Sequence, residues 1–292
     1  MTPLLHKITL IGVGLIGGSF VLDAKRHQLT QRVCGIDLDT NNLKRALERR
    51  VIDDARTEIC ASALSDADLV VIATPVATLP EICRQISPLL PENTIISDVG
   101  STKQSTIAAF RQHLPHHFSR CVAAHPIAGS DRSGATAAQF GLYDNKKLIL
   151  CPHEAQDEDC LKTVERLWQH VGAQTHRMNA AEHDAIFAAV SHLPHLLAFA
   201  YVHQLLDDPK GKEYLHFAGS GFRDFTRIAA SNAHMWKDII LANRPALLDL
   251  IAAQQQQLNQ LTQILHNQDA HALLNYLAQA REVREQWGQN NG

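Results

Sequence analysis

The sequence lacks the features that mark several large classes of protein. Its formal net charge of −3 gives no basic excess that would indicate a nucleic acid or an anionic membrane as partner. The six cysteines form no CxxC pair, and several lie in apolar surroundings, so we expect free thiols in a reducing cytosol. No uninterrupted apolar run is long enough to span a membrane, and the N-terminus has no basic segment followed by a cleavage site. These absences favour a cytoplasmic globular protein.

The histidines, although there are 17 of them, form no recognisable metal site. The HxxHH stretch at 113–117 is accompanied by no further set of ligands, and SHLPH at 191–195 lacks a carboxylate at a typical spacing. We therefore expect no metal cofactor.

The pattern of apolar residues changes near residue 177. Before it, short segments rich in Val and Ile alternate with amphipathic segments, which indicates a parallel sheet covered by helices on both faces. The segments predicted as strands are KITLIG, RVCGID, DLVVIATP, NTIISDVG, RCVAAH and KKLILCP, and the predicted helices include LIGGSFVLDAKRH, TNNLKRALERR and TLPEICRQISPLL. After it, the strand signals stop and the chain is predicted to be helical. We expect an α/β domain over residues 1–177 and an all-helical domain over residues 178–292, closely packed because no Pro- or Gly-rich linker joins them.

A glycine-rich hexapeptide, GVGLIG at 12–17, follows the first predicted strand and opens the first helix. It fits G-x-G-x-x-G, in which Gly12 allows a tight turn, Gly14 a close approach of a pyrophosphate, and Gly17 the packing of the helix on the strand. The N-terminus of that helix offers free N–H groups to the phosphates. These features predict a Rossmann-type dinucleotide site; the alternative is glycines that only shape a strand–helix turn.

Asp37 ends the second predicted strand, about 20 residues after the last of these glycines, where such sites carry an acidic residue. A carboxylate there accepts hydrogen bonds from the ribose hydroxyls and repels a 2′-phosphate, which predicts NAD rather than NADP. The alternative is an Asx turn, since IDLDTN is rich in turn residues.

The predicted strand TIISDVG ends at Ser101, and the predicted strand RCVAA ends at His125. Both side chains should therefore lie at the carboxyl edge of the sheet, beside the cofactor. A neutral imidazole can accept the proton of a substrate hydroxyl near pH 7, and Pro126 restricts the backbone of His125. The alternatives are a strand-end histidine bonded to backbone, and a capping box formed by S-T-K-Q at 101–104.

Two motifs stand out in the helical part. SHLPH places His192 and His195 three residues apart around a proline, where a kinked helix would turn them toward a cleft, although a packing role for His192 is the alternative. FRDFTRIA at 222–229 contains Arg223, Asp224 and Arg227, and an arginine on a partly apolar helix can bind a carboxylate through two hydrogen bonds. The alternative there is an ordinary ion pair with Asp224.

The motifs GVGLIGGS, ATPV, DVGSTK, AAHPIAGSDRSG, SHLPH and FRDFTRIA occur in this order. Together they resemble the prephenate/arogenate (cyclohexadienyl) dehydrogenase family of tyrosine biosynthesis over essentially the whole chain. The resemblance implies a Rossmann domain followed by a helical domain that forms a homodimer. It also implies oxidative decarboxylation of prephenate or arogenate with hydride transfer to NAD. Nothing in the sequence resembles a fused chorismate mutase or a regulatory domain, so we expect a single activity.

The resemblance also implies roles for individual residues. His125 corresponds to the catalytic histidine that hydrogen-bonds the ring hydroxyl, and Ser101 to its orienting partner. Arg227 corresponds to the arginine that binds a substrate carboxylate, and His195 to a histidine of the substrate pocket. Further residues that the resemblance implies are the ionic pair Arg223 and Asp224 near the pocket entrance and the cofactor-binding residues Gly12, Gly14, Leu15, Ile16, Gly17, Asp37, Thr74 and Pro75. At Asp131 the family more often has Glu.

Two other functions are open to this sequence. A β-hydroxyacid dehydrogenase has a similar architecture but needs a catalytic lysine in the helical part, and nothing like its surroundings occurs between residues 160 and 240. A non-catalytic NAD-binding sensor would need no proton acceptor beside the nicotinamide. The sequence does not distinguish prephenate from arogenate, and it does not show whether tyrosine inhibits.

The segment after residue 240 is unusually apolar for a surface helix. Its apolar positions are Leu247, Leu250, Ile251, Leu258, Leu261, Ile264 and Leu265, more than one narrow stripe requires. We expect this region to form most of a homodimer interface.

Overall fold

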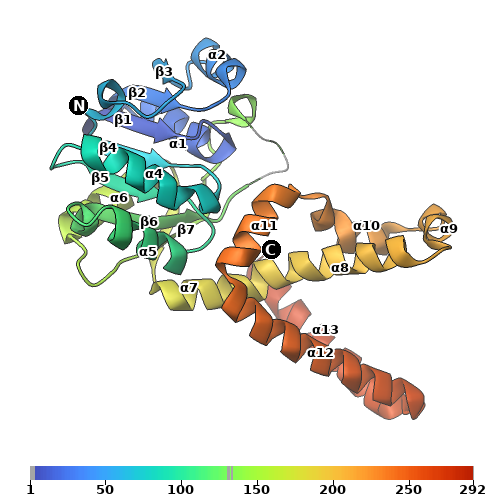
Figure 1. Cartoon of the computed structure of the whole chain (residues 1–292). Coiled ribbons are helices and arrows are strands. Elements are labelled where there is room, and N and C mark those ends of the chain that lie inside the picture. The colour runs from blue at the N-terminus through green and yellow to red at the C-terminus, as the bar shows by residue number, and fades with distance from the viewer. Residues whose placement is uncertain (1–3, 130–131, 133, 292) are drawn as a thin grey trace. The chain divides into compact units, whose positions relative to one another are not determined.

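An eight-stranded sheet organises the first part of the chain in the computed structural model, which describes residues 4–129, 132 and 134–291 (Figure 1). The strand order is β3-β2-β1-β4-β5-β6-β7-β8. The strands are β1 Leu5–Ile11, β2 Thr30–Ile36, β3 Asp54–Arg56, β4 Leu69–Ile72, β5 Ile95–Asp98, β6 Cys121–Pro126, β7 Lys147–Cys151 and β8 Gln174–Arg177.

Helices cover both faces of this sheet, as its apolar strands require. They are α1 Leu15–Arg26, α2 Thr40–Glu48, α3 Ala61–Leu64, α4 Leu79–Ile86, α5 Gln104–His113 and α6 Glu158–His170. Side chains alternate along each strand between two cores, for example Val70 and Ile72 on one face and Leu69 and Val71 on the other. The first pair packs with α3, α4 and α5, and the second with α1, α2 and α6.

All six predicted strands are present, and the expected fold class, a Rossmann-type α/β sheet followed by helices, is confirmed. The expectation of a fully parallel sheet is wrong at one point, because β7 runs antiparallel to β6. The connection between them contains, in its described residues, only the short 3-10 turn η4 Ala135–Ala137, and an antiparallel neighbour needs no crossover helix. The short polar strands β3 and β8 were not predicted.

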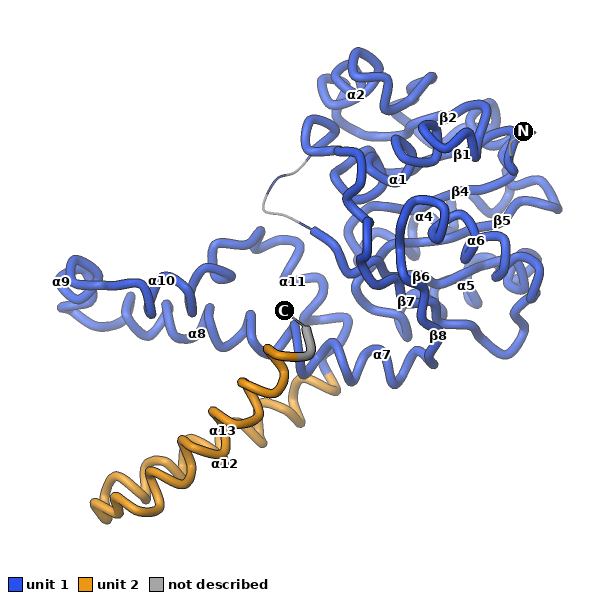
Figure 2. The backbone as a smooth tube through the Cα atoms, turned by 180° about the vertical axis from the view of Figure 1, so that it is seen from behind, with its two compact units in different colours: residues 1–244 blue, residues 245–292 orange. Residues whose placement is uncertain are grey.

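The remainder of the chain is helical from residue 180 onward. Its helices are α7 Ala180–Phe187, α8 Leu193–Asp207, α9 Gly211–His216, α10 Ser220–Thr226, α11 Ala233–Ala242, α12 Arg244–His266 and α13 Ala270–Asn291. Residues 1–244 form one compact unit, which includes α7 to α11, and residues 245–292 form a second (Figure 2). Within the second unit, Tyr276 Oη of α13 donates a hydrogen bond to Gln257 Oε1 of α12 at 3.0 Å.

One helical segment, Ala180–Asp207, has the length and composition of a membrane-spanning helix, with a mean hydropathy of 1.6, although we expected no such segment. It is interrupted by a π-helical turn at Ala188–His192, and its first turns carry the buried polar residues His183 and Asp184. All six cysteines are free, as predicted, and only Cys60 is partly exposed.

The glycine at position 17 generates a stability prediction. A Cβ atom there would lie 2.6 Å from Leu10 Cδ1 and 2.7 Å from Ala73 Cβ, whereas one at Gly14 would have no atom within 4 Å. Gly17→Ala should therefore push α1 off the sheet at a cost of about 1–3 kcal/mol, offset in part by better helix propensity of at most about 1 kcal/mol. Thermal unfolding should show a lower Tm for Gly17→Ala and a Tm near wild type for Gly14→Ala. Equal losses would contradict this account of the close packing.

Candidate active site

The strands β1, β4, β5 and β6 run parallel to one another, so their carboxyl ends meet at one edge of the sheet. Each is followed or ended there by residues of the predicted site: the glycine turn after β1, Thr74 after β4, Ser101 after β5 and His125 at the end of β6. Open α/β sheets bind ligands at this edge. The topology therefore brings the predicted cofactor and proton-transfer residues together.

The glycine turn has the shape that a dinucleotide requires. Gly12 has φ +90°, and a side chain there would collide with Ala73 O at 2.6 Å. Gly14 precedes α1 with no side-chain cap and with open space where a Cβ would stand, so the N–H groups at the start of α1 are accessible to a phosphate. Behind the turn, Leu15 is buried, and the carbonyl of the half-buried Ile16 accepts a hydrogen bond from Tyr143 Oη at 2.5 Å.

Two further predicted cofactor residues flank this turn. Thr74 Oγ1 accepts a hydrogen bond from Thr78 Oγ1 at 2.8 Å, and the exposed Pro75 directly precedes the 3-10 turn η1 Val76–Thr78. The segment after β4 lies against the glycine turn, since its residue Ala73 faces Gly12 and Gly17.

Asp37, which follows β2, is fixed by three hydrogen bonds. Its Oδ2 accepts from the backbone N–H of Val13 and from Asn42 Nδ2, both at 3.0 Å, and its Oδ1 accepts from the N–H of Asp39 at 3.0 Å. The last bond is the Asx turn that the sequence offered as an alternative. The carboxylate is half-buried and bound to the glycine turn itself, and Oδ1 keeps acceptor capacity for a ligand.

His125 is the penultimate residue of β6 and is half-buried. Its Nδ1 lies 2.8 Å from His183 Nε2, and its ring makes an edge contact with Phe187, with ring centroids 4.9 Å apart. Burial, followed by the positive charge of Lys103 and by His183, lowers the pKa of His125 well below 6.5. The imidazole is therefore neutral at neutral pH and can accept a proton.

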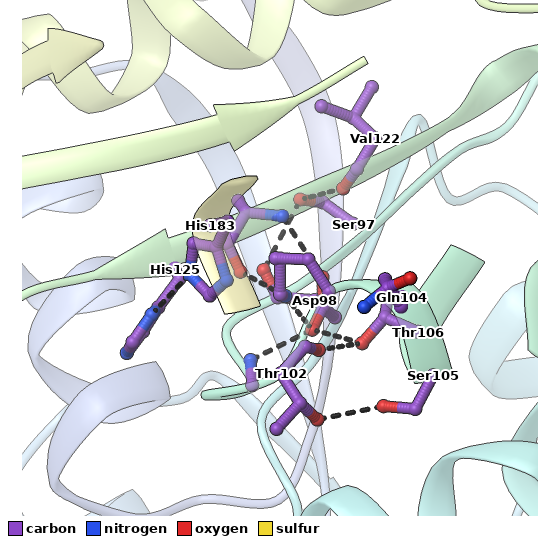
Figure 3. A network of polar contacts seen from close by, with 12 residues as sticks. Ser97, Asp98, Thr102, Gln104, Ser105, Thr106, Val122, His125 and His183 are labelled. Atoms are coloured by element: carbon purple, nitrogen blue, oxygen red, sulfur yellow. Dashed lines mark hydrogen bonds and ion pairs between the residues drawn. The ribbon is translucent and has the colours of Figure 1, made fainter. Parts of the chain in front are cut away.

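A buried ion pair ties the ends of β5 and β6 together beside this histidine. Lys103 Nζ lies 2.5 Å from Asp98 Oδ2 and donates to the carbonyl of Ala124 at 2.6 Å. Asp98 Oδ1 accepts from the N–H of Ala124 at 3.0 Å, and Thr106 Oγ1 donates to Oδ2 at 3.2 Å. Figure 3 shows Asp98 and Thr106 within this network, next to His125 and His183. Neither Lys103 nor Asp98 was predicted as a site residue, although they are the last and first residues of DVGSTK.

His183 and Asp184 of α7 were also missed. Asp184 accepts from the backbone N–H groups of Lys103 at 2.7 Å and Gln104 at 2.9 Å, so it caps helix α5 from a distant helix. The capping box proposed for S-T-K-Q is therefore wrong: α5 begins at Gln104 without a local side-chain cap. The available signal was the pair HD within the apolar stretch AEHDAIFAAV, because adjacent polar residues on an apolar helix need buried partners.

Ser101 lies three residues after the end of β5, which finishes at Asp98 rather than at Ser101 as predicted. Its side chain is half-buried and makes no hydrogen bond to any residue that the structure describes, whereas the ring partner of His125 is His183. The neighbouring Thr102 Oγ1 pairs with Ser105 Oγ at 2.7 Å instead.

The predicted interruption at SHLPH takes the form of the π-helical turn at Ala188–His192. His195 Nδ1 donates to the carbonyl of Ser191 at 2.9 Å, and its ring stacks on Trp236 with centroids 3.6 Å apart. Burial, opposed by that hydrogen bond, and the positive charge of Arg227 lower the pKa of His195. Asn243 Nδ2 donates to Nδ1 of the buried His192 at 3.1 Å, so the ring of His192 has a hydrogen-bond partner within the fold.

Arg223 and Asp224 lie on α10, and Arg227 begins the 3-10 turn η6 Arg227–Ala230 that follows it. All three side chains are exposed, and none forms an ion pair with a residue in the described part of the chain. The expected pair between Arg223 and Asp224 is thus not formed here. Asp131 lies outside the described residues.

Two family models together match most of the chain. A family model described as prephenate dehydrogenase, nucleotide-binding domain, matches residues 20–177, and one described as prephenate dehydrogenase, dimerization domain, matches residues 179–279. The chain belongs to the prephenate dehydrogenase family. The family expected from the motifs is therefore confirmed.

Individual relatives resemble the chain over nearly its full length. A prephenate dehydrogenase of Bacillus subtilis is 34% identical over 287 residues, which are 98% of this chain and 77% of the relative. A cyclohexadienyl dehydrogenase of Zymomonas mobilis is 30% identical over 286 residues, 97% of this chain and 96% of the relative. The crystal structure of a prephenate dehydrogenase from A. aeolicus, in complex with hydroxyphenyl propionate and NAD+, matches with a TM-score of 0.90 and 33% identity, covering 97% of this chain and 98% of that one.

The buried histidines predict a pH-dependent stability. Burial lowers the pKa of His192 to about 4, below the value near 6.5 expected in the unfolded chain. Between these values the unfolded chain binds a proton at His192 and the folded chain does not. The free energy of unfolding should therefore fall as the pH falls from about 6.5 to about 4, by about 1.4 kcal/mol per pH unit for this residue.

Urea unfolding at several pH values measures this slope. His192→Gln should make the slope shallower, and the exposed control His234→Gln should leave it unchanged. An unchanged slope in His192→Gln would show that His192 does not carry the effect.

Proposed function

We propose that this protein catalyses the oxidative decarboxylation of prephenate to 4-hydroxyphenylpyruvate with hydride transfer to NAD, in tyrosine biosynthesis. Arogenate, which would yield tyrosine, is the second candidate substrate. Membership of the family supports the activity. The observation that carries the proposal is the position of His125: a neutral imidazole at the end of β6, at the sheet edge where the glycine turn can bind a dinucleotide.

The residues of the site supply proton transfer and binding. NAD, when bound, accepts the hydride from C4 of the cyclohexadienol ring. His125 takes the proton of the hydroxyl on the same carbon and the ring carboxylate leaves as carbon dioxide. The ring then becomes aromatic with a phenolate oxygen, to which the proton on His125 returns. Aromatisation supplies the driving force, so no separate decarboxylating residue is required. Ser101, three residues after the end of the neighbouring strand β5, is a candidate for hydrogen bonding to the substrate hydroxyl or to His125.

The cofactor site fits NAD without a metal. We assign Gly12, Gly14, Leu15, Ile16 and Gly17 to the pyrophosphate turn, Asp37 to the adenosine ribose, and Thr74 and Pro75 to the nicotinamide side. The open space at Gly14 and the uncapped start of α1 support the first assignment. The half-buried carboxylate of Asp37, bonded to Val13 N–H within that turn, supports the second.

Absorbance of reduced nicotinamide, with prephenate and arogenate each crossed with NAD and NADP, tests the function. We expect turnover with NAD and a lower kcat/KM with NADP, because a carboxylate facing a 2′-phosphate is a like-charge contact worth several kcal/mol. His125→Asn should lower kcat by roughly 10²–10⁴-fold with a modest change in KM. Absence of turnover by the wild-type protein would contradict the proposed activity. An equal kcat/KM with NAD and NADP would contradict the role of Asp37.

Arg227 is the proposed partner of a substrate carboxylate, with His195 beside it in the pocket and Arg223 and Asp224 at its entrance. The effect of the Arg227 charge on the pKa of His195 supports placing the two in one site. Prephenate carries two carboxylates, so a fixed cation should contribute to its binding. The exposure of Arg227 in a single chain leaves its guanidinium free for such a ligand.

Arg227 is exposed in the single chain, so a pair with a substrate carboxylate is desolvated only where the bound substrate covers the guanidinium. Loss of one side of such a desolvated pair costs about 2–5 kcal/mol, or roughly 30-fold to several-thousand-fold in binding. Arg227→Ala should therefore raise the KM for prephenate sharply, with kcat less affected and NAD affinity nearly unchanged. The exposed Arg281, which pairs with Glu285 on α13, offers the control Arg281→Ala. Weaker NAD binding with an unchanged substrate KM would place the carboxylate site elsewhere.

We also propose that the protein is a cytoplasmic homodimer, with functional domains over residues 1–177 and 178–292. The last strand ends at Arg177, and the second family model, a dimerisation domain, begins at residue 179. Apolar side chains that the single chain exposes support an interface, among them Leu258, Leu265, Leu274, Leu277 and Val283 on α12 and α13. An open hollow on α8 adds apolar surface from Leu196, Phe199 and Ala200, and its other lining residues are His203, Gln204 and Asp207.

Light scattering at micromolar concentration should give the mass of a dimer, because an obligate interface of more than roughly 2,000 Å² would hold two chains together at that concentration. A monomer under these conditions would contradict the proposed assembly.

A further inference from the structure

A line of hydrogen bonds runs from His125 to the N-terminus of helix α5. Nδ1 of His125 lies 2.8 Å from Nε2 of His183, and Nδ1 of His183 lies 2.8 Å from Oδ1 of Asp184. The Asp184 carboxylate accepts in turn from the backbone N–H groups of Lys103 and Gln104. The side chains of His183 and Asp184 are 0% and 2% exposed, so bulk water does not compete for these contacts. Figure 3 shows the rings of His125 and His183 joined by a dashed line.

One arrangement of protons satisfies every contact in this line, assigned here from the partners of each atom. Asp184 accepts from two N–H groups at the positive end of a helix, which stabilises its ionised form, and an ionised carboxylate can only accept. Nδ1 of His183 must therefore donate to Asp184, which leaves Nε2 of a neutral His183 as an acceptor. Nδ1 of His125 must then donate to His183, and Nε2 of a neutral His125 carries no proton.

The charges around the line favour the same arrangement. Burial opposes the charge of Asp184, but the hydrogen bonds from His183 and the two backbone N–H groups outweigh it and lower the pKa of Asp184. Burial also lowers the pKa of His183; its bond to Asp184 opposes that shift, and the charge of Lys103 adds to it. The rings of His125 and His183 are therefore neutral. They lie near the ionised carboxylate of Asp184 and the buried ammonium group of Lys103, which is itself paired with Asp98.

We propose that His183 and Asp184 are positioning residues that hold His125 in the one tautomer whose Nε2 can take the proton of the substrate hydroxyl. This inference rests on the proposed function. In that step the O–H bond of the substrate breaks and an Nε2–H bond forms on His125. The resulting imidazolium keeps its Nδ1–H bond to His183, and the ionised Asp184 at the far end of the line stabilises its positive charge.

Proton positions can be observed directly in the resting protein. Long-range ¹H–¹⁵N spectra of histidine-labelled protein distinguish an Nδ1–H from an Nε2–H tautomer, and comparison with the His125→Asn and His183→Phe variants assigns the signals. We expect the Nδ1–H tautomer for both His125 and His183 in the wild type. In His183→Phe, His125 should lose this single tautomer because its acceptor is gone. An Nε2–H tautomer of His125 in the wild type would overturn the proposal.

Kinetics separate positioning from packing. His183→Phe should lower kcat by roughly 10²-fold or more while the KM values for prephenate and NAD change by less than about threefold, because binding contacts are untouched. His183→Gln, whose amide oxygen can still accept from Nδ1 of His125, should recover much of that loss. Asp184→Asn is less suitable, because its amide would set a donor against the N–H groups that begin α5 and weaken the fold.

Phe187 provides the matched control. Its ring centroid lies 4.9 Å from that of His125 and 4.5 Å from that of His183, but it makes no hydrogen bond to either ring. Phe187→Leu should keep kcat within about threefold of wild type and leave the tautomers unchanged. An equal loss in Phe187→Leu and His183→Phe, with no recovery in His183→Gln, would reduce His183 to a packing residue. If the wild type oxidises neither substrate, the proposed function fails, while the spectra still decide whether the tautomer is fixed.

Discussion

The buried ion pair between Lys103 and Asp98 is the contact on which the rest of the site depends. The backbone pairing between β5 and β6 joins only Ile96–Ser97 to the first two residues of β6. Further along β6, the Asp98 carboxylate binds the N–H of Ala124 and the Lys103 ammonium group binds its carbonyl. Because Ala124 directly precedes His125, the pair fixes the backbone that carries the imidazole. Removing one partner would leave an uncompensated buried charge, which typically costs 3–5 kcal/mol, so the pair must be kept or replaced as a unit.

The same pair sets the electrostatics of the neighbouring rings. The ammonium group of Lys103 disfavours a proton on His125 and His183, while the backbone N–H of the same residue helps to keep Asp184 ionised. One residue thus acts on two protonation states, one through its side chain and the other through its main chain. The helical part contributes to this order as well, because Asn243 after α11 donates to the carbonyl of Asp184 at 2.7 Å and to His192.

Much of the fold could be predicted from the sequence, because long apolar strands and a glycine turn are local patterns. The six predicted strands have a run of Val, Ile, Leu, Cys or Ala to bury, whereas β3 and β8 consist mainly of polar residues and exist only because a neighbouring strand is there to pair with them. The site was predictable where a residue adjoins a strand end, as with His125. The cap of α5 could not be predicted. It is the carboxylate of Asp184, which lies 81 residues after Lys103 in the sequence, and the local S-T-K-Q pattern contains no sign of this tertiary contact.

The π-helical turn at Ala188–His192 lets this helix hold one residue more than a regular α-helix of the same length. A π turn takes up the extra residue locally, so the segments on either side keep nearly the phase of an uninterrupted helix. Deleting one residue within the turn would therefore leave His183 and Asp184 close to their present orientation relative to His195. Elsewhere in the helix no such turn absorbs the change, and losing or gaining one residue would rotate these side chains by about 100° relative to His195. The π turn is thus the one place in this helix where the residue count can change while the line from His125 to Asp184 is kept.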